Sequence, residues 1–276
     1  MMSARFLTVV LERAFNMRDG FGREIDYMRI SVIDSCNLNC YYCNPCDNNE
    51  HCHALNILSV KEVLCIVRAA TRLGIKHFRL TGGEPLLHPQ LDEMVLQIKK
   101  IPGVSSVSLT TNAVLLAQHA KWLKEAGIDS INVSLDTIDA SEYERITKKP
   151  LLEEVKHGIN AAIECGIRVK INVVLTPQTD VVALTRYVAK KGTDIRFIEM
   201  MPVGEGHTNG VEPYKKVIGT LSKLYGEPCR INTEKTKEIN SGNDKRKIPD
   251  NGPAEYYIFP ELGIRVGLIQ AIHGKF

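Results

Sequence analysis

The sequence predicts an α/β protein in which a parallel sheet closes part of the way into a (β/α)6 TIM-type barrel. Six β-rich runs alternate with amphipathic helical segments, which is the pattern of parallel strands joined by crossover helices. Polar residues gather at the ends of the strands, where parallel barrels place their active sites. Four of the helical segments are followed by glycine, the residue that helix C-caps favour, at Gly103, Gly127, Gly166 and Gly192.

The expected elements follow one another in a regular order. Strands are expected at residues 28–34, 77–81, 105–110, 130–135, 169–175 and 195–200. Helices with one apolar face are expected at residues 60–73, 90–100, 116–126, 152–165, 181–190 and 214–225. We assign residues 1–228 to the barrel, and residues 229–276 to a linker and the start of an incomplete C-terminal β extension. In that extension, residues 255–259 and 264–269 are expected to form a hairpin.

Length and composition limit the class of protein. At 276 residues the chain has room for one large domain, and its net charge of +3 gives no argument for a nucleic-acid partner. No apolar run approaches the roughly 20 residues of a membrane span, and the N-terminus lacks the pattern of a signal peptide. Five of the eight cysteines lie between residues 36 and 52, which favours metal-bound thiolates in a reducing cytoplasm over disulfides.

The string Cys36-x3-Cys40-x2-Cys43 follows the first expected strand, which ends at Asp34. Three thiolates so close together can hold three corners of one cubic iron–sulfur cluster, whereas most such clusters take four cysteines. The fourth iron then stays open to a substrate or cofactor, which makes this loop a candidate reaction centre. The alternative is a zinc site, with further ligands from the set Cys46, His51, Cys52 and His53.

A second motif, Gly82-Gly83-Glu84-Pro85, follows the second expected strand directly. Adjacent glycines let a backbone approach a ligand closely. Their carbonyls and the Glu84 carboxylate can accept hydrogen bonds from an ammonium group. The alternative is an ordinary strand-to-helix turn, since Gly-Gly and Pro mark turns in many proteins. The position of the motif, after the strand that follows the cysteine loop, favours a ligand-binding role.

The cysteine string, with the aromatic Tyr42 before its third cysteine, resembles that of the radical S-adenosylmethionine (SAM) enzymes. Within this superfamily the chain resembles the GTP 3′,8-cyclases, the lyases that begin molybdenum-cofactor biosynthesis, from about Gly22 to Phe276. The strings that carry the resemblance are RISV at 29–32, FRLTGGEP at 78–85, LTTN at 109–112, INVSLD at 131–136, VKINVV at 169–174 and IRFIEMM at 195–201.

The resemblance implies a [4Fe-4S] cluster on the three cysteines, whose open iron binds SAM. The positions implied to contact SAM are Tyr42, Gly82, Gly83, Glu84, Ser134 and Met201. Those implied to contact GTP, or to adjoin it at strand ends, are Arg29, Arg79, Thr110, Lys170, Asn172 and Arg196. Arginine forks and a lysine suit a triphosphate, which carries several negative charges. Because an arginine on an apolar strand is costly unless it is paired, Asp136 and Glu199 are expected to pair with these arginines.

The implied activity is conversion of GTP to 3′,8-cyclo-7,8-dihydro-GTP, begun by a 5′-deoxyadenosyl radical that removes the ribose 3′ hydrogen. An electron donor of the flavodoxin or ferredoxin type is expected. No nucleic-acid or membrane partner is expected, and a homodimer is left open. The alternatives are a radical SAM enzyme that acts on another nucleotide or on a peptide, and a non-catalytic metal-binding protein.

The sequence departs from the family pattern at its C-terminus. The family carries a second [4Fe-4S] cluster, whose first two cysteines follow a string that resembles residues 271–276. The sequence ends on Phe276, so it does not contain these ligands, and we expect weaker GTP binding and turnover that is low or absent. Either the sequence is cut short, or it is a natural short relative in which Cys46 and Cys52 are candidate ligands of a substitute cluster.

Overall fold

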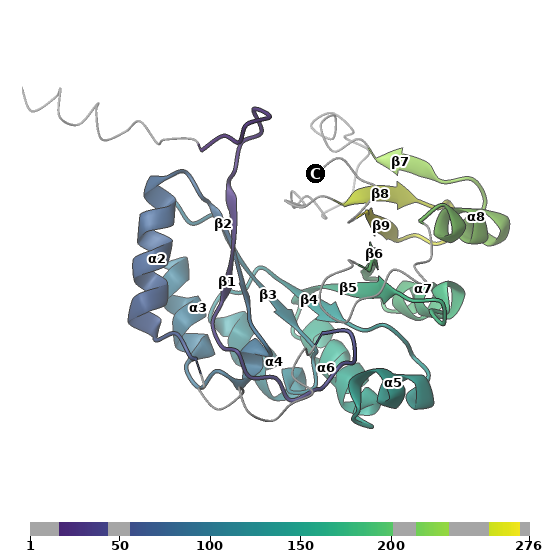
Figure 1. Cartoon of the computed structure of the whole chain (residues 1–276), viewed down its shortest axis with the longest axis horizontal. Helices are drawn as coiled ribbons and strands as arrows, with labels where there is room; N and C mark the ends of the chain where they lie inside the picture. The colour runs from purple at the N-terminus through teal and green to yellow at the C-terminus, as the bar shows by residue number, and fades with distance from the viewer. Residues whose placement is uncertain (1–16, 44–55, 201–213, 232–253, 271–276) are drawn as a thin grey trace, which may run out of the picture.

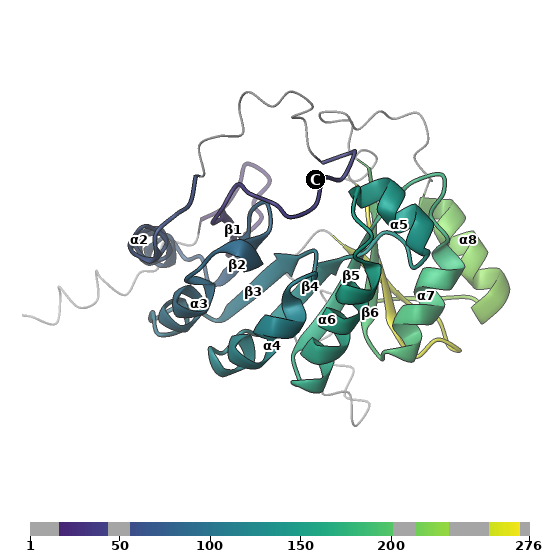
Figure 2. The same ribbon diagram turned by 90° about the horizontal axis from the view of Figure 1, so that it is seen from below.

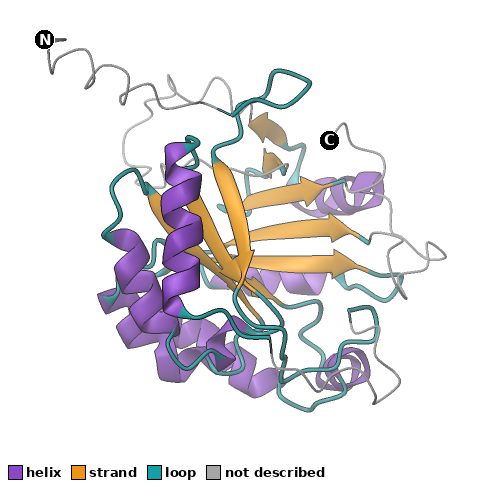
Figure 3. Cartoon of the chain, turned by 60° about the vertical axis from the view of Figure 1, so that its left-hand side comes forward, coloured by secondary structure: helices purple, strands orange, loops and turns teal. Residues whose placement is uncertain are grey.

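The computed structural model describes residues 17–43, 56–200, 214–231 and 254–270, which form a curved sheet with helices along its outer face (Figures 1 and 2). The described strands make one nine-stranded sheet in the order β1-β2-β3-β4-β5-β6-β9-β8-β7. This order is linear, so β1 and β7 are edges and the barrel is open, as the curvature in Figure 3 also shows. The predicted α/β partial barrel is therefore confirmed.

All of the predicted strands and helices have counterparts, with ends that shift by a few residues. The parallel strands are β1 Tyr27–Ser31, β2 His77–Thr81, β3 Ser106–Thr111, β4 Ser130–Ser134, β5 Arg168–Leu175, β6 Asp194–Glu199 and β9 Arg265–Ile269. The helices are α2 Val60–Arg72, α3 Leu91–Lys99, α4 Leu116–Glu125, α5 Ala140–Thr147, α6 Leu152–Glu164, α7 Val181–Lys190 and α8 Tyr214–Tyr225, with a 3-10 turn η1 at Pro85–Leu87. Of these, α5 and η1 were not predicted.

Local signals set the ends of the helices. At the start of α2, the Ser59 hydroxyl accepts from the Glu62 amide, and the Glu62 carboxylate accepts from the Ser59 amide at 2.8 Å, which forms a capping box. The four glycines predicted to follow helices all have positive φ, between 64° and 91°. Glycine adopts this conformation without strain, so the chain can turn back towards the next strand. No described helix has the length and apolar character that crossing a lipid bilayer requires.

The two faces of the parallel sheet differ in chemistry. Side chains that point to the helices are apolar and fully buried, as in Phe78, Leu109, Ile131 and Phe197. The intervening residues lie on the concave face and are mostly polar or charged, which gives strands β2 to β6 a period of two. Parallel strands covered by helices on both faces are continuously apolar, so this alternation marks a concave face without helices.

A C-terminal hairpin extends the sheet beyond β6. Strand β8 (Glu255–Ile258) pairs antiparallel with β9, which confirms the predicted hairpin, and β9 pairs parallel with β6. A short strand that was not predicted, β7 (Cys229–Ile231), pairs with β8 at the edge. The hairpin thus continues the barrel sheet, and the division of the chain after residue 228 stays a prediction.

Candidate functional site

The cysteine loop and the glycine loop lie together at the carboxyl ends of β1 and β2. The Gly83 amide donates to the Ile33 carbonyl at 2.7 Å, and the Glu84 amide donates to the Ser35 carbonyl at 2.7 Å. A Cβ on Gly83 would lie 2.2 Å from the Ser35 oxygen, so only glycine permits this approach. The prediction from sequence was that the glycines approach a ligand; in the structure the backbone they approach is the cysteine loop.

Glu84 connects the glycine loop to the end of β3. Its side chain is buried, and its carboxylate accepts from the Leu86 amide at 3.0 Å, the Thr111 hydroxyl at 2.6 Å and the Asn112 amide at 2.7 Å. Burial raises the pKa of Glu84, and these three hydrogen bonds oppose that shift. Both carboxylate oxygens already accept protein donors, so a bond to a ligand ammonium would be an additional one and stays a prediction.

The three cysteine thiols are free, with Cys36 and Cys43 exposed and Cys40 half-buried. The Leu38 amide donates to the Cys36 sulfur at 3.5 Å, and the Asn112 side-chain amide approaches the same sulfur at 3.8 Å. Burial raises the pKa of the Cys36 thiol. Burial, and after it the negative charge of Asp136, raises the pKa of the Cys40 thiol to about 12.

These thiols fit a cubic iron–sulfur cluster. All three lie on one short loop at the mouth of the barrel, and N–H donors reach one of the sulfurs, which is a common feature of protein-bound clusters. Within the described residues, no three Cys, His, Asp or Glu side chains converge on a single ion. A cubic cluster does not need such convergence, because each thiolate binds a different iron. The proposed zinc ligands Cys46, His51, Cys52 and His53 lie outside the described residues.

Tyr42 is fixed from the other side of the loop. Its hydroxyl donates to the carboxylate of Asp136, whose second oxygen accepts from the Val174 amide at 2.7 Å. Burial raises the pKa of Asp136 to about 6, although both hydrogen bonds lower it. The expectation that Asp136 pairs with an arginine is therefore wrong, because its carboxylate is buried against the Tyr42 phenol and a backbone amide. Ser134, two residues earlier, ends β4 with an exposed side chain.

The residues predicted to contact GTP come together on the concave face. Arg29 lies opposite Arg79 in the β1–β2 pairing, and Arg79 donates to the Ser108 hydroxyl at 3.1 Å. Thr110 and Lys170 flank the same residue of β4 from either side. The structure thus brings side chains from neighbouring strands to one surface, which spacing in the sequence could only suggest.

Arg196 is held by two asparagines on the same face. Its Nε donates to the Asn172 oxygen at 3.0 Å, and one of its terminal nitrogens donates to the Asn132 oxygen. Gly267 lies beside it on β9, and a Cβ there would lie 2.6 Å from the Arg196 Cγ and 2.9 Å from the Tyr256 ring. Glycine at 267 therefore leaves the space that the Arg196 side chain occupies.

The sequence analysis did not select two asparagines that are candidate functional residues. Asn112 approaches the Cys36 sulfur at 3.8 Å, and Asn132 lies on the concave face. Asn132 is buried between Thr110 and Lys170, and its side-chain nitrogen has no hydrogen-bond partner within the described residues. A buried donor of this kind normally has a partner. The signal in the sequence was a polar residue alternating with Ile131 and Val133 in an otherwise apolar strand.

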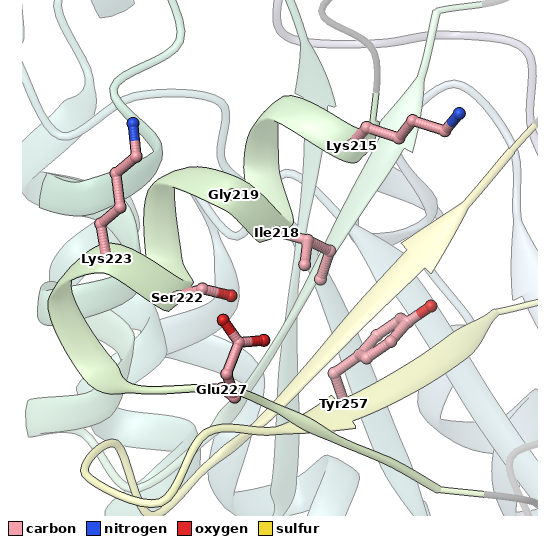
Figure 4. A pocket seen from close by; sticks show the side chains of 7 residues that line it. All are labelled: Lys215, Ile218, Gly219, Ser222, Lys223, Glu227 and Tyr257. Atoms are coloured by element: carbon pink, nitrogen blue, oxygen red, sulfur yellow. The ribbon is translucent and has the colours of Figure 1, made fainter.

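Two parts of the predicted site fall outside the described residues, and two further features of the structure lie away from the site. Met201, predicted to contact SAM, and residues 271–276 lie outside the described residues. At the opposite ends of the strands, Asp194 pairs with Arg265 and lies 3.7 Å from Arg168. A shallow pocket of about 500 Å³ lies between α8 and β8 (Figure 4), and none of the predicted site residues lines it: Lys215, Ile218, Gly219, Ser222, Lys223, Glu227 and Tyr257.

Comparison with known proteins identifies relatives of this chain. The radical SAM superfamily model matches residues 30–184. The GTP 3′,8-cyclase of Clostridium perfringens (strain SM101 / Type A) is 36% identical over 263 residues, which cover 94% of this chain and 77% of that protein. The GTP 3′,8-cyclase of Pelotomaculum thermopropionicum is 36% identical over 267 residues, covering 94% of this chain and 78% of that protein.

Solved structures confirm the fold. Methylornithine synthase (PylB) superposes with a TM-score of 0.58 at 17% identity, and the match covers 73% of this chain and 62% of that one. At this identity the likeness concerns the fold alone. It agrees with the α/β fold of the described residues.

Proposed function

Because the chain belongs to the radical SAM superfamily and, within it, to the GTP 3′,8-cyclase family, we propose that it converts GTP to 3′,8-cyclo-7,8-dihydro-GTP. The observation that carries the proposal is that two surfaces of the barrel adjoin: the cysteine and glycine loops, and a basic concave face. A three-cysteine loop is bonded to the glycine loop, and both border a concave face with Arg29, Arg79, Lys170 and Arg196.

The cysteine side of the mouth suits a [4Fe-4S] cluster and SAM. When bound, they supply a 5′-deoxyadenosyl radical by one-electron cleavage of the SAM sulfur–carbon bond. Cys36, Cys40 and Cys43 would hold the cluster. The amides of Gly83 and Glu84 are already bonded to the cysteine loop, so the acceptors that the glycine loop can offer are carbonyls, which suit an ammonium group. Tyr42, Gly82, Glu84, Ser134 and Met201 are the other proposed SAM contacts.

The basic side of the mouth suits a nucleoside triphosphate. Arg29 and Arg79 are opposite one another, so two guanidinium groups can share one phosphate chain. Arg196 is oriented by two neutral asparagine oxygens, which fix its planar donors before substrate arrives. Thr110, Lys170 and Asn172 complete the proposed GTP contacts. A phosphate-bearing substrate explains this charge better than a peptide does.

The proposal also covers the pathway, the cellular compartment and the electron donor of the enzyme. We assign it to molybdenum-cofactor biosynthesis in the cytoplasm, with a flavodoxin or ferredoxin as electron donor. The cysteine content of the loop agrees with a reducing compartment. We keep residues 1–228 as the radical SAM barrel and residues 229–276 as the beginning of a C-terminal region.

Anaerobic reconstitution tests the proposed function. The purified chain is loaded with iron and sulfide, then incubated with SAM, dithionite and GTP. The expected result is a brown protein that releases 5′-deoxyadenosine and forms the cyclic nucleotide at a low rate. Release of 5′-deoxyadenosine without a GTP product would favour a radical SAM enzyme with another substrate. A loaded cluster that never yields 5′-deoxyadenosine would favour a non-catalytic iron–sulfur protein, and a colourless zinc-loaded protein would favour the zinc site.

A further inference from the structure

The carboxylate of Asp136 connects the cysteine loop to the body of the barrel. Asp136 follows β4 and is only 9% exposed. One of its oxygens accepts from the Val174 amide of β5 at 2.7 Å, and the other accepts from the Tyr42 hydroxyl. Tyr42 lies 94 residues away in the sequence, between Cys40 and Cys43. A single side chain therefore joins the loop to two strands.

The same half of the loop also rests on the end of α5. The Asn39 amide donates to the Thr147 carbonyl at 3.0 Å, and the Tyr41 amide donates to the Ile146 carbonyl at 3.1 Å. These carbonyls belong to the last turn of α5, where the helix itself leaves them without a partner. The purple loop runs beside α5 in Figures 1 and 2. Asp136 and α5 are thus two supports of the segment 39–43, and both come from the connection that follows β4.

The other half of the loop has separate supports. Near Cys36, the Ser35 carbonyl accepts from the Glu84 amide, and the Asn37 side chain accepts from Asn112 at 2.7 Å. These contacts come from the carboxyl ends of β2 and β3. Loss of the Asp136 bond should therefore loosen the segment that holds Cys40 and Cys43, which keeps its two bonds to α5, while the Cys36 end stays in place.

We propose that Asp136 is a positioning residue that holds the Tyr42 ring and thereby presents Cys40 and Cys43 for cluster binding. The proposal rests on the proposed function for the cluster, but the fixing of the loop is a property of the chain itself. An O–H···O⁻ bond is about twice as strong as one between neutral groups, and burial keeps water from replacing it. Such a bond favours one orientation of the half-buried Tyr42 ring.

Thiol labelling of the complete metal-free chain provides the first test. Rates of maleimide labelling are measured separately for each cysteine by peptide mapping. Tyr42→Phe keeps the ring and the Asp136 charge but removes the hydroxyl, so we expect labelling of the half-buried Cys40 to accelerate about tenfold, equivalent to about 1.4 kcal/mol. Labelling of Cys65 and Cys165, on α2 and after α6, should not change.

A double-mutant cycle isolates the role of Asp136. Asp136→Ala removes a negative charge near Cys40 and so changes its reactivity directly, which makes the single variant ambiguous. The decisive quantity is the effect of Tyr42→Phe in the Asp136→Ala background, where we expect less than about a twofold change. Tyr187→Phe is the matched control, because the Tyr187 hydroxyl is buried on α7 without a partner in the described residues, and it should leave Cys40 labelling unaltered.

A second readout follows cluster retention. After reconstitution, iron loss to a chelator should be about tenfold faster in Tyr42→Phe than in the parent, and Asp136→Asn should lie within about threefold of the parent. The asparagine can accept from Val174 and donate to the phenol oxygen, so it replaces both bonds.

The outcomes separate this inference from the proposed function. An unchanged Cys40 labelling rate in Tyr42→Phe would overturn the inference, whether or not Asp136→Ala folds. An equal effect of Tyr42→Phe in both backgrounds would overturn the role of Asp136. Labelling as expected in a chain that takes up no cluster would retain the fixing of the loop and refute the proposed function. If the cluster forms and the chain converts GTP, but Cys40 labelling is unchanged in Tyr42→Phe, the proposed function is retained and the inference about Asp136 is refuted.

Discussion

Replacement of the buried Glu84 is the sharpest test of how the two loops are built. Its carboxylate accepts three hydrogen bonds, from the Leu86 amide, the Thr111 hydroxyl and the Asn112 amide, and its side chain is 1% exposed. Glu84→Ala removes all of these acceptors at once. The two backbone amides and the hydroxyl then remain buried without a partner, at a cost of about 1–3 kcal/mol each.

The expected loss of unfolding free energy is smaller than the sum of the three unpaired groups. Burial raises the pKa of Glu84, so removing the carboxylate also removes a desolvation penalty and offsets part of the loss. We therefore expect Glu84→Ala to lower the free energy of unfolding by about 3–5 kcal/mol, a large part of the 5–15 kcal/mol of a typical domain. In Glu84→Gln, one oxygen can keep Leu86 and Thr111, and only Asn112 loses its acceptor, so we expect about 1–2 kcal/mol.

Urea unfolding of the metal-free chain, followed by circular dichroism, measures both variants. Glu93→Ala is the matched control, because Glu93 lies exposed on α3 and bonds only the neighbouring Gln97 side chain, so it should change the free energy by less than about 0.5 kcal/mol. A loss below about 1 kcal/mol in Glu84→Ala would refute the reasoning, since three buried donors would then have cost almost nothing. Equal losses in Glu84→Ala and Glu84→Gln would refute the assignment of two bonds to one oxygen.

Three further predictions concern other parts of the site. Gly83→Ala places a Cβ 2.2 Å from the Ser35 carbonyl and should reduce reconstituted iron per chain at least about tenfold, measured by colorimetric iron assay. Asn132→Asp gives Arg196 a carboxylate partner and should weaken GTP binding about tenfold by calorimetry, because the new charge repels phosphate. Burial raises the pKa of Asp136 to about 6, so the unfolded chain releases this proton first as pH rises. The parent should therefore lose about 2 kcal/mol of unfolding free energy relative to Asp136→Asn between pH 4 and 6, by urea titration at each pH.

Each of these has a control and a contradicting result. Gly219→Ala on α8 is the control, because no atom lies within 4 Å of the new Cβ. Full iron loading in both Gly219→Ala and Gly83→Ala would contradict the steric argument. Asn160→Asp adds a charge beside Lys191 on the outer helices, and equal GTP affinities for it and Asn132→Asp would contradict the electrostatic argument. A parent and Asp136→Asn that share one pH profile would show that Asp136 titrates as in the unfolded chain.

Most of the barrel could be predicted because its signal repeats. Each of the six strand–helix units carries an apolar strand, an amphipathic helix and a following turn, and all six exist. Helix α5 was missed because its sequence, ASEYERIT, is short and largely polar, with Tyr143 and Ile146 as its only large buried side chains. Its start signal was available, since Asp139 caps the helix by accepting from the Glu142 amide at 2.8 Å.

The members of the site could be predicted better than their partners. Cys36 and Glu84 were recognised from motifs and follow the carboxyl ends of β1 and β2, where parallel barrels place active sites. The hydrogen-bond partner of each side chain depends on how loops from different strands meet. Charge alone is a poor guide to these partners. Asp136 illustrates this, because opposite charge suggests an arginine, whereas the nearest donors are the Tyr42 phenol and the Val174 amide.

Along the concave face, the charged side chains differ in the kind of partner that they bond. At the amino ends of the strands, Asp194 neutralises Arg265 and approaches Arg168, which closes that end with a structural ion pair. Nearer the middle of the strands, Arg79 and Arg196 donate to the neutral oxygens of Ser108, Asn172 and Asn132. A neutral acceptor orients a guanidinium without adding a negative charge beside it, so these contacts agree with the anionic substrate that we propose.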